Sequence, residues 1–357
     1  MTQAKERSKQ PPYAILRGGY KYKETLGMRR VTTYCMDIVE TEEILYVLIR
    51  ADGEGGNIRR INWKDEDLDV FGSFTWPVQM IQDSEGKLYV SDEGKHCVYV
   101  LKDEGEKGFV PIGQTADAQE SSTKTIEIGE YGSGEGQLDS PSGNCFDDNE
   151  DLYVVDTGNN RIQKFDKNGK HLSTIGSQTG DNTLDMPWGI AINHKGEILV
   201  SDWRNNRICV FDKSGEFTHS FGEIHISLGL DVKQLDGPAG ISIDDDGDIY
   251  VADRNNNRVV IYDREERYVT QIIGDATLSQ IGKTYIMSSP RVLRLREMAN
   301  REQWRLLRAP ASVRTYGKLI YIPDFGCHRL QVYEKESYPL SKDEIFEQPN
   351  HPTLYNV

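Results

Sequence analysis

Short apolar runs alternate with polar turns along most of the chain. Examples are "LYVV" at 152–155, "ILVS" at 198–201 and "IYVA" at 249–252, each followed directly by Asp. Runs of about four to eight residues bounded by Gly, Asn and Asp favour β-strands, because helices need longer periodic segments. The pattern predicts a chain built mainly of short strands.

These runs belong to a repeat. The segment 140–176 recurs at 186–222 and 237–274, and weaker copies begin at Val31, Trp76 and Ala309. Each copy predicts four strands: a Pro-x-Gly-apolar run, an "LYVxD" run, an "RIQxFD" run and a run ending in "IG". Tight turns such as "DKNG" and "DKSG" join them. A repeated unit of four strands over about 40 to 50 residues is typical of a β-propeller blade. Six copies predict an all-β fold with six blades.

The last copy lacks a fourth strand. After "RLQVYEK" the C-terminal segment offers no match, whereas "YKYKETLG" at 20–27 does. We expect this N-terminal strand to complete the last blade and close the ring, which removes free sheet edges. The predicted organisation is an N-terminal extension at 1–19, a propeller at 20–336 with insertions at 103–126 and 275–308, and a C-terminal tail at 337–357.

The repeat resembles the NHL repeat family over nearly the whole chain. The copies at 140, 186 and 237 are the most similar, together with the connector "GSGEGQLDSPSG" at 132–143. The resemblance implies a six-bladed β-propeller. Its usual binding face is the rim that carries the loops between second and third strands, with the central channel. Propellers host many unrelated activities, so the fold alone names no function.

Composition narrows the classes of partner. The 357 residues carry a formal net charge of −15, which disfavours nucleic acid and anionic membrane surfaces as partners. No apolar run approaches the roughly 18 residues of a membrane span, and the first 19 residues lack the apolar core of a signal peptide. We therefore expect a soluble, cytoplasmic protein. Its five scattered cysteines suggest neither a disulfide framework nor a zinc site.

An Asp and an Arg recur at fixed places in the repeat. Asp ends the second strand at positions 92, 156, 202, 253 and 324, and Arg begins the third strand at positions 161, 207, 258 and 329. A pair that recurs in blade after blade serves something that every blade needs. We expect the Asp to cap turn amides and to pair with the Arg, while the Asn before that Arg adopts the left-handed conformation.

Candidate ligand-binding residues are those that break the repeat. Trp188 follows a blade-opening Pro, and Trp203 follows the recurrent Asp of the same blade. The two rings could form an aromatic wall for a ligand, or pack between blades. Asn144 stands where sister copies have Ile or Val, so it needs a ligand, a water or a backbone group as partner.

Two histidines and an arginine also break the pattern in the turns. His96 and His328 replace the Asn of the turn, and they could share a metal only if they meet across the channel. Arg50 lies near the place of the missing Asp in the expanded turn "RADGEGGN" at 50–57. It could bind a carboxylate or phosphate, or simply reflect loop variation.

The second insertion predicts a basic helix. In "SSPRVLRLREMANREQWRLLRAP" at 288–310, Ser289 could cap a helix that begins at Pro290. One arc of this helix would carry the arginines at 291, 294, 301, 305 and 308 beside an apolar stripe. Of these we select Arg294, Arg301 and Arg305 as ligand-binding candidates. The helix could cover an anionic ligand, dock an acidic partner, or pair with the chain's own carboxylates.

Two classes of function fit these features. The first is a ligand- or protein-binding propeller that uses its upper rim and channel mouth for a small anionic molecule or an acidic protein surface. The alternative is a lyase or hydrolase with its active site at the channel mouth under the helix at 289–308. No catalytic residue is identified, no cofactor is predicted, and no ligand motif supports a divalent metal at the channel mouth.

The repeat is also distantly similar to that of the peptidylglycine amidating lyases. That resemblance implies a zinc held by His at blade starts. The positions after the blade-opening Pro are instead Val78, Ser142, Trp188, Ala239 and Ala311. This zinc chemistry is therefore not expected here. The acidic "DDDGD" at 244–248 has calcium-like spacing, but we expect it to be the hairpin between two strands.

Overall fold

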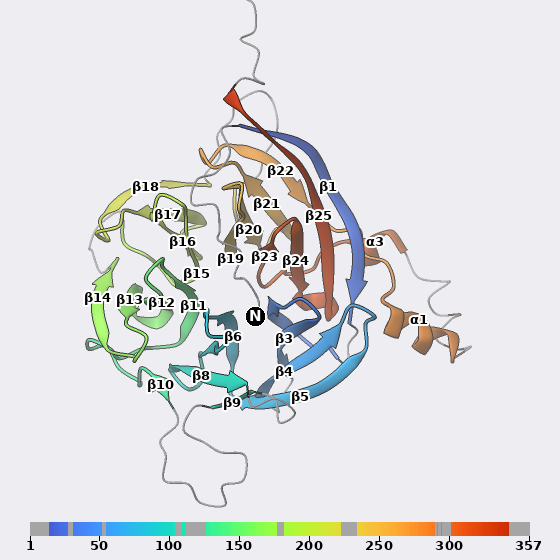
Figure 1. Ribbon diagram of the computed structural model, residues 1–357, viewed down its shortest axis with the longest axis horizontal. Coiled ribbons are helices and arrows are strands. Elements are labelled where there is room, and N and C mark those ends of the chain that lie inside the picture. The colour runs from blue at the N-terminus through green and yellow to red at the C-terminus, as the bar shows by residue number, and fades with distance from the viewer. Residues whose placement is uncertain are drawn as a thin grey trace, which may run out of the picture.

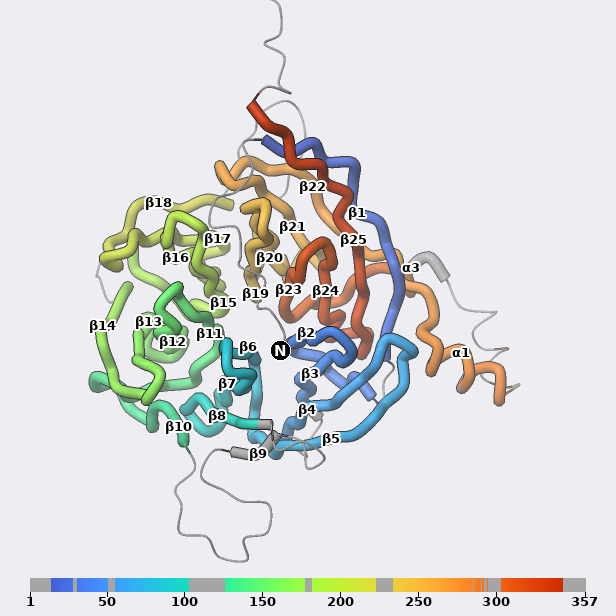
Figure 2. The backbone as a smooth tube through the Cα atoms, viewed as in Figure 1, coloured from blue at the N-terminus to red at the C-terminus, as the bar shows by residue number. Residues whose placement is uncertain are grey.

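Six antiparallel sheets stand around a common axis in the computed structural model of the protein (Figure 1). The structure describes residues 14–27, 31–51, 55–103, 109–111, 126–176, 182–222, 234–289, 291, 294 and 301–342. The tube in Figure 2 follows the chain once around the ring, blade after blade. The predicted six-bladed all-β propeller is confirmed.

The first three blades take up the first half of the ring. Blade 1 contains β2 (Cys35–Glu40), β3 (Ile44–Ala51), β4 (Gly55–Asn62) and β5 (Asp67–Phe74). Blade 2 contains β6 (Pro77–Gln82), β7 (Leu88–Asp92) and β8 (Cys97–Asp103), with β9 (Phe109–Pro111) and β10 (Glu127–Ile128) both paired with β8. Blade 3 contains β11 (Pro141–Phe146), β12 (Leu152–Asp156), β13 (Arg161–Phe165) and β14 (His171–Ile175).

The other three blades complete the ring. Blade 4 contains β15 (Pro187–Ile192), β16 (Ile198–Asp202), β17 (Arg207–Phe211) and β18 (Phe217–Phe221). Blade 5 contains β19 (Pro238–Ile243), β20 (Ile249–Asp253), β21 (Arg258–Tyr262) and β22 (Tyr268–Ile272). Blade 6 contains β23 (Arg314–Tyr316), β24 (Leu319–Asp324), β25 (Arg329–Leu340) and β1 (Ala14–Leu26).

The core lies between blades rather than within them. The first strand of each blade packs against the first strand of the next, nearest the axis (Figure 1). The second strands β7, β12, β16 and β20 are buried along their whole length, because a neighbouring blade covers each face. Six apolar clusters lie mainly between adjacent blades. Burial of these faces is what holds the ring together.

The N-terminal strand closes the ring as predicted. β1 pairs with β25 from Ala14 opposite Leu340 to Leu26 opposite Leu330. The strand begins six residues before the expected start at 20, and β25 continues to Leu340, past the expected end of the propeller at 336. The two boundaries set at 19 and 336 thus fall inside this long pair of strands.

A buried lysine strengthens the closure. Lys335 of β25 places its Nζ 2.6, 2.8 and 2.9 Å from the carboxylates of Asp244, Asp246 and Asp248. Arg17 of β1 pairs with Asp248 as well. The "DDDGD" segment is therefore the β19–β20 hairpin, as expected, and the Lys335 ammonium occupies the centre of its carboxylates. These contacts tie blade 6 to blade 5.

The two insertions leave the ring at different places. The first contains β9 and is followed by β10; both strands pair with β8, so this insertion precedes the last strand of blade 2. The second follows β22 and contains α1 (Gln280–Met287) and α3 (Arg301–Arg305). Ser279 caps α1 by accepting a hydrogen bond from the backbone N of Gly282. Neither of these described helices has the length and apolar character that crossing a membrane requires.

Candidate functional site

In blades 3 to 6 the recurrent Asp and Arg join the blade to the segment that leads into it. Asp156 accepts hydrogen bonds from the backbone N of Asp139 and from Nε of Arg161, 2.7 Å away. Arg161 Nη2 in turn donates to the carbonyl oxygens of Gly134 and Gln137. The carboxylate and the guanidinium together satisfy the backbone groups of the leading segment. The predicted structural role of this pair is confirmed.

The same pair of a buried Asp and an Arg five residues later, which we name the fastener, recurs in other blades. The equivalent Nε to Oδ2 contacts join Arg207 to Asp202, Arg258 to Asp253 and Arg329 to Asp324. In blade 2, Asp92 accepts from the backbone N atoms of Thr75 and Trp76. All five Asp side chains are buried. Because these residues are committed to the architecture, they are not candidates for a ligand site.

The last residue of each turn links one blade to the next. Asn160, Asn206 and Asn257 have φ of 53° to 56°, and each Oδ1 accepts from a backbone N of the following blade. His96 and His328 adopt the same left-handed conformation. Their Nδ1 atoms accept from the backbone N of Ser140 and of Tyr34, at 3.0 Å in each case.

The two histidines therefore stand in for Asn as blade connectors. His96 joins blade 2 to blade 3, and His328 joins blade 6 to blade 1. Each is held by a different neighbour, so the structure does not bring them together. In the part of the chain that is described, no group of three or more His, Cys, Asp or Glu could hold a metal ion.

A single variable position follows each buried Asp at the start of the turn. It is occupied by Glu93, Thr157, Trp203, Arg254 and Phe325 in blades 2 to 6. In all five blades the buried Asp accepts a hydrogen bond from a backbone N of the segment that leads into the blade. The first side chains of these turns therefore present five different chemistries on one rim. Three of them, with Trp188 and Arg50, form what we name the inner-rim cluster: Arg50, Trp188, Trp203, Arg254 and Phe325.

Aromatic rings flank the guanidinium of Arg254. Trp188 and Trp203 stack with ring centroids 4.8 Å apart and an interplanar angle of 28°. The Cζ of Arg254 lies 4.5 Å from the Phe325 centroid and 6.0 Å from that of Trp188. These distances fit cation–π contacts. Trp188 also packs against the buried cores that surround it, so it serves interblade packing as well as the cluster.

Arg254 has no counter-ion in the described part of the chain. Its Nη1 is buried and has no hydrogen-bond partner there, and the side chain makes no ion pair with a described carboxylate. Burial, and secondarily the positive charge of Arg50, lower the pKa of Arg254 to about 10. The charge of Arg50 thus disfavours the charged form of Arg254. Such an arrangement attracts an anion.

Arg50 is held from the side of blade 2. Its Nη2 lies 3.1 Å from Oε2 of Glu93, and its Nε donates to the carbonyl oxygen of Pro77. Its Cζ is 5.2 Å from the Trp76 centroid. The charge of Arg50 is thus partly offset by Glu93, whereas that of Arg254 is not. Residues 52–54 of the expanded turn lie outside the described residues.

Asn144 lies in the interface between blades 2 and 3. Its side-chain Nδ2 donates to Oγ of Ser91, and its backbone carbonyl oxygen accepts from Nε2 of Gln79. The residue is completely buried, and Oδ1 has no hydrogen-bond partner among the described residues. Asn144 therefore belongs to a polar contact between blades 2 and 3, and the partners it has there are protein groups.

The expected continuous helix at 290–308 is wrong at its C-terminal end. α3 ends at Arg305, so Arg308 lies beyond the helix and does not share a helical face with Arg305. The chain leaves the helix because the backbone N of Leu307 donates to the carbonyl of Ile273 and the Leu307 side chain is buried. This turn leads the chain back to blade 6. Residues 290, 292–293 and 295–300 lie outside the described residues, as does the side chain of Arg301.

The two described helices of the insertion, α1 and α3, also lie away from the axis of the ring. Figure 1 shows α1 and α3 outside the ring, beyond β25 and β1, rather than over the axis. Arg305 Nη2 lies 2.8 Å from Oδ1 of Asp275. Arg294 is helical and exposed. Arg305 therefore pairs with one of the chain's own carboxylates, which was the alternative to a ligand or partner contact.

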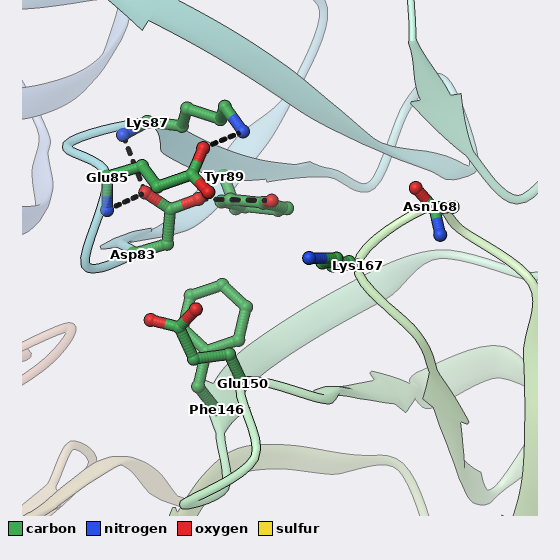
Figure 3. Close-up of a pocket in the computed structure, with 8 residues that line it drawn as sticks. All are labelled: Asp83, Glu85, Lys87, Tyr89, Phe146, Glu150, Lys167 and Asn168. Atoms are coloured by element: carbon green, nitrogen blue, oxygen red, sulfur yellow. Dashed lines mark hydrogen bonds and ion pairs between the residues drawn. The ribbon is translucent and has the colours of Figure 1, made fainter.

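A polar depression lies between the hairpins of blades 2 and 3 (Figure 3). Its lining is Asp83, Glu85, Lys87, Tyr89, Phe146, Glu150, Lys167 and Asn168. Asp83 Oδ1 accepts from two backbone N atoms of its own hairpin, and Glu150 Oε1 accepts from the backbone N of Ser84. Its carboxylates thus shape the hairpins, and the depression is a weaker candidate than the inner-rim cluster.

The sequence pattern missed Arg254 and Phe325. Trp203 was selected because it follows the recurrent Asp, and Arg254 and Phe325 occupy that same position in blades 5 and 6. The signal was therefore present in the alignment of the repeats. It was obscured because "DRNNNR" looks like an ordinary polar turn.

Comparison with known proteins agrees with the architecture. The NHL repeat family model matches residues 138–165, 184–211 and 235–262, which lie in blades 3, 4 and 5. The chain is thus a propeller that carries NHL repeats. No curated protein matches the sequence.

Several solved structures share the fold. Selenomethionine-substituted virginiamycin B lyase from Staphylococcus aureus is 12% identical, with a TM-score of 0.55 over 88% of this chain and 99% of that one. A catalytically inactive form of that lyase with quinupristin is 14% identical, with a TM-score of 0.52 over 91% and 90%. An auxiliary nutrient binding protein from Bacteroides ovatus is 14% identical, with a TM-score of 0.56 over 92% and 78%. At these identities the likeness concerns the fold alone.

Proposed function

We propose that this six-bladed propeller with NHL repeats is a binding protein that takes a small anionic ligand at its inner-rim cluster. One observation carries the proposal. The guanidinium of Arg254 is partly buried, with a buried Nη1 that has no hydrogen-bond partner among the described residues. A buried positive charge without a counter-ion costs free energy that an anion would return.

Arg50 adds to this preference. Its charge contributes to lowering the pKa of Arg254, so the two cations repel each other. An anion between them would replace repulsion with two attractions. The attraction between the anion and the two arginines would be stronger at this partly buried place than on the open surface, because the effective dielectric constant is lower.

The aromatic side chains suit a ligand that is more than a bare ion. Trp188, Trp203 and Phe325 are all partly buried, so each keeps some ring surface accessible. Small-molecule sites commonly combine such rings with a few polar groups that fix orientation. The cluster offers both kinds of contact within one rim.

The described residues favour binding over catalysis. Glu93 at this rim pairs with Arg50, and the Nδ1 atoms of His96 and His328 accept backbone hydrogen bonds. A neutral imidazole that accepts at Nδ1 carries its proton on Nε2, which leaves neither nitrogen as a free base. The solved neighbours include both a lyase and nutrient binding proteins, so the fold supports either activity. A lyase or hydrolase site beneath the helical insertion is not proposed, since α3 lies outside the ring.

The experiment is a titration of the whole protein with small anions. Thermal shift and tryptophan fluorescence are measured with acetate, benzoate, inorganic phosphate and sulfate. We expect at least one anion to stabilise the protein and to change the fluorescence of the Trp188–Trp203 pair. Arg254→Met should abolish both responses.

Arg204→Met is the matched control. Arg204 is an exposed arginine in the equivalent turn of blade 4, with Asp185 3.7 Å away. Its removal changes the net charge by the same amount and should leave the anion response intact. If all four anions fail to shift the protein, or if both substitutions weaken the response equally, the proposed site is wrong.

A further inference from the structure

We infer that the ligand presents a planar carboxylate joined to a flat apolar group, so that the inner-rim cluster selects aromatic or similarly flat monocarboxylic acids. This inference rests on the proposed function and specifies its ligand. It follows from three features of the cluster: the way in which rings surround Arg254, the balance of charge, and the stacked tryptophans.

The rings leave the edge of the Arg254 guanidinium for the ligand. Phe325 lies against the group at 4.5 Å from Cζ, and Trp188 lies at 6.0 Å. Anions cannot approach through these rings, so they must meet the N–H groups at the edge of the guanidinium. The N–H groups of a guanidinium form a planar fork that matches the two oxygens of a carboxylate.

The charge of the cluster suits a monoanion. Arg50 and Arg254 contribute two positive charges, and Glu93, 3.1 Å from Arg50, contributes one negative charge. For the inner-rim cluster and Glu93 taken together, the balance is therefore one positive charge. A carboxylate neutralises it, whereas the dianion of a phosphate monoester would leave an excess negative charge beside Glu93. Like charges at such a site oppose binding.

The stacked tryptophans suit the apolar part of the ligand. Trp188 and Trp203 stack on each other, with ring centroids 4.8 Å apart and planes 28° from parallel, and Trp188 lies beside Arg254. The outer face of such a stack is a flat aromatic surface. A flat group attached to the carboxylate could lie against this surface while the carboxylate meets the guanidinium. Aromatic pairs gain stabilisation beyond the burial of their area.

The test compares matched probes by isothermal titration calorimetry at pH 7.5. Benzoate carries both features, acetate lacks the ring, benzamide lacks the charge, and phenylphosphate replaces the carboxylate with a tetrahedral dianion. We expect benzoate to bind about tenfold or more tightly than acetate or phenylphosphate, and benzamide to show no binding.

Arg254→Lys tests whether binding needs the planar pair of guanidinium N–H groups or only a positive charge. Lysine keeps the positive charge but cannot make two parallel in-plane hydrogen bonds. We expect it to weaken benzoate binding by about tenfold or more, with little effect on phenylphosphate. Arg204→Lys is the control and should change neither affinity.

The outcomes distinguish the inference from the proposed function. If phenylphosphate or acetate binds as tightly as benzoate, or if Arg254→Lys binds benzoate as well as the native protein, the ligand class is wrong while anion binding stands. The same holds if benzoate fails but inorganic phosphate binds in an Arg254-dependent way. If no anion binds, both the ligand class and the proposed function are wrong.

Discussion

Arg254 and Phe325 come from neighbouring blades and meet at the inner rim, where the guanidinium carbon lies 4.5 Å from the ring centroid. Each directly follows a buried Asp, Asp253 or Asp324, whose carboxylate holds the Arg five residues further on. The same fastener therefore sets the backbone of both turns. The variable side chains of the candidate site stand on this shared frame.

Glu93→Gln should raise the affinity for a monoanion. The substitution removes the carboxylate 3.1 Å from Arg50, so the full charge of Arg50 acts on the ligand. We expect benzoate to bind about three- to tenfold more tightly at low salt, and the gain to shrink as salt is added, because these groups are partly exposed. Titration at two ionic strengths measures the effect.

Glu85→Gln serves as the control for that substitution. Glu85 lines the polar depression between the hairpins of blades 2 and 3, and its removal changes net charge equally. It should leave benzoate affinity unchanged. Equal gains for both variants would mean that net charge, and not the Arg50–Glu93 pair, governs binding.

Asp253→Ala should be severely destabilising. It leaves Arg258, whose side chain is 8% exposed, without its carboxylate, and it removes the acceptor for the backbone N of Asp236. Removing one partner of a buried ion pair costs about 3 to 5 kcal/mol. Denaturant titration measures the change in the free energy of unfolding.

The matched comparison is Arg267→Met. Arg267 also pairs with an Asp, Asp263, but its side chain is 75% exposed. Exposed pairs contribute about 0 to 1 kcal/mol. Similar losses for the two variants would contradict the role of the buried pair as a blade fastener.

His328→Asn should preserve stability where His328→Ala does not. His328 has a left-handed φ of 55°, and its Nδ1 accepts from the backbone N of Tyr34. Asn meets both requirements at the same position of blades 3, 4 and 5. Ala tolerates this conformation less well and leaves the amide without its acceptor, at a cost of roughly 1 to 3 kcal/mol. Thermal melts of the two variants decide; a stable Ala variant would exclude the connector role.

The closure of the ring should weaken at alkaline pH. Burial alone would lower the pKa of Lys335, but the attraction of Asp244 and Asp248 outweighs it and raises the pKa. The stabilisation is complete below the ordinary lysine pKa of about 10.4 and is lost as pH rises through the raised value. Burial raises the pKa of Tyr20 to about 12. From about pH 10 to 12 the unfolded chain releases this proton first, so stability falls over that window too.

Tyr20→Phe isolates part of this effect. It keeps the ring that packs edge-on against Tyr250 but removes the ionisable hydroxyl. The melting temperature should decline less steeply between about pH 10 and 12 than in the native protein. Tyr131→Phe, at an exposed tyrosine of the rim, is the control. An unchanged slope in Tyr20→Phe would show that this phenol is not linked to unfolding.

Much of the fold could be predicted because residues that recur at the same position in several copies of the repeat serve the structure that the copies share. The Asp and Arg of "DTGNNRI" were expected to be structural since sister blades carry them, and the contacts of Asp156 with Arg161 confirm it. The closure by the N-terminal strand followed from a missing fourth strand in the last copy. Its full length, from Ala14, was not expected, because residues 14–19 lie outside the repeat pattern.

The site was predicted less completely. Trp188, Trp203 and Arg50 were found because they visibly depart from their sister copies. Arg254 was missed because arginine in a polar turn suggests a solvated side chain, and only its neighbours Trp188 and Phe325 show otherwise. The arginine-rich helix was predicted to extend too far toward its C-terminal end, since helical periodicity cannot show where the chain must turn back into the next blade.

The sequence by itself determined the blade, the number of blades, the fastener and the strand that closes the ring. These are local or repeated features, and each copy of a repeat must bury the same faces against its neighbours. Only the tertiary structure decided which variable side chains meet. Arg50, Trp188 and Arg254 lie on three different blades, far apart in the chain, and closing the ring is what sets them around one axis.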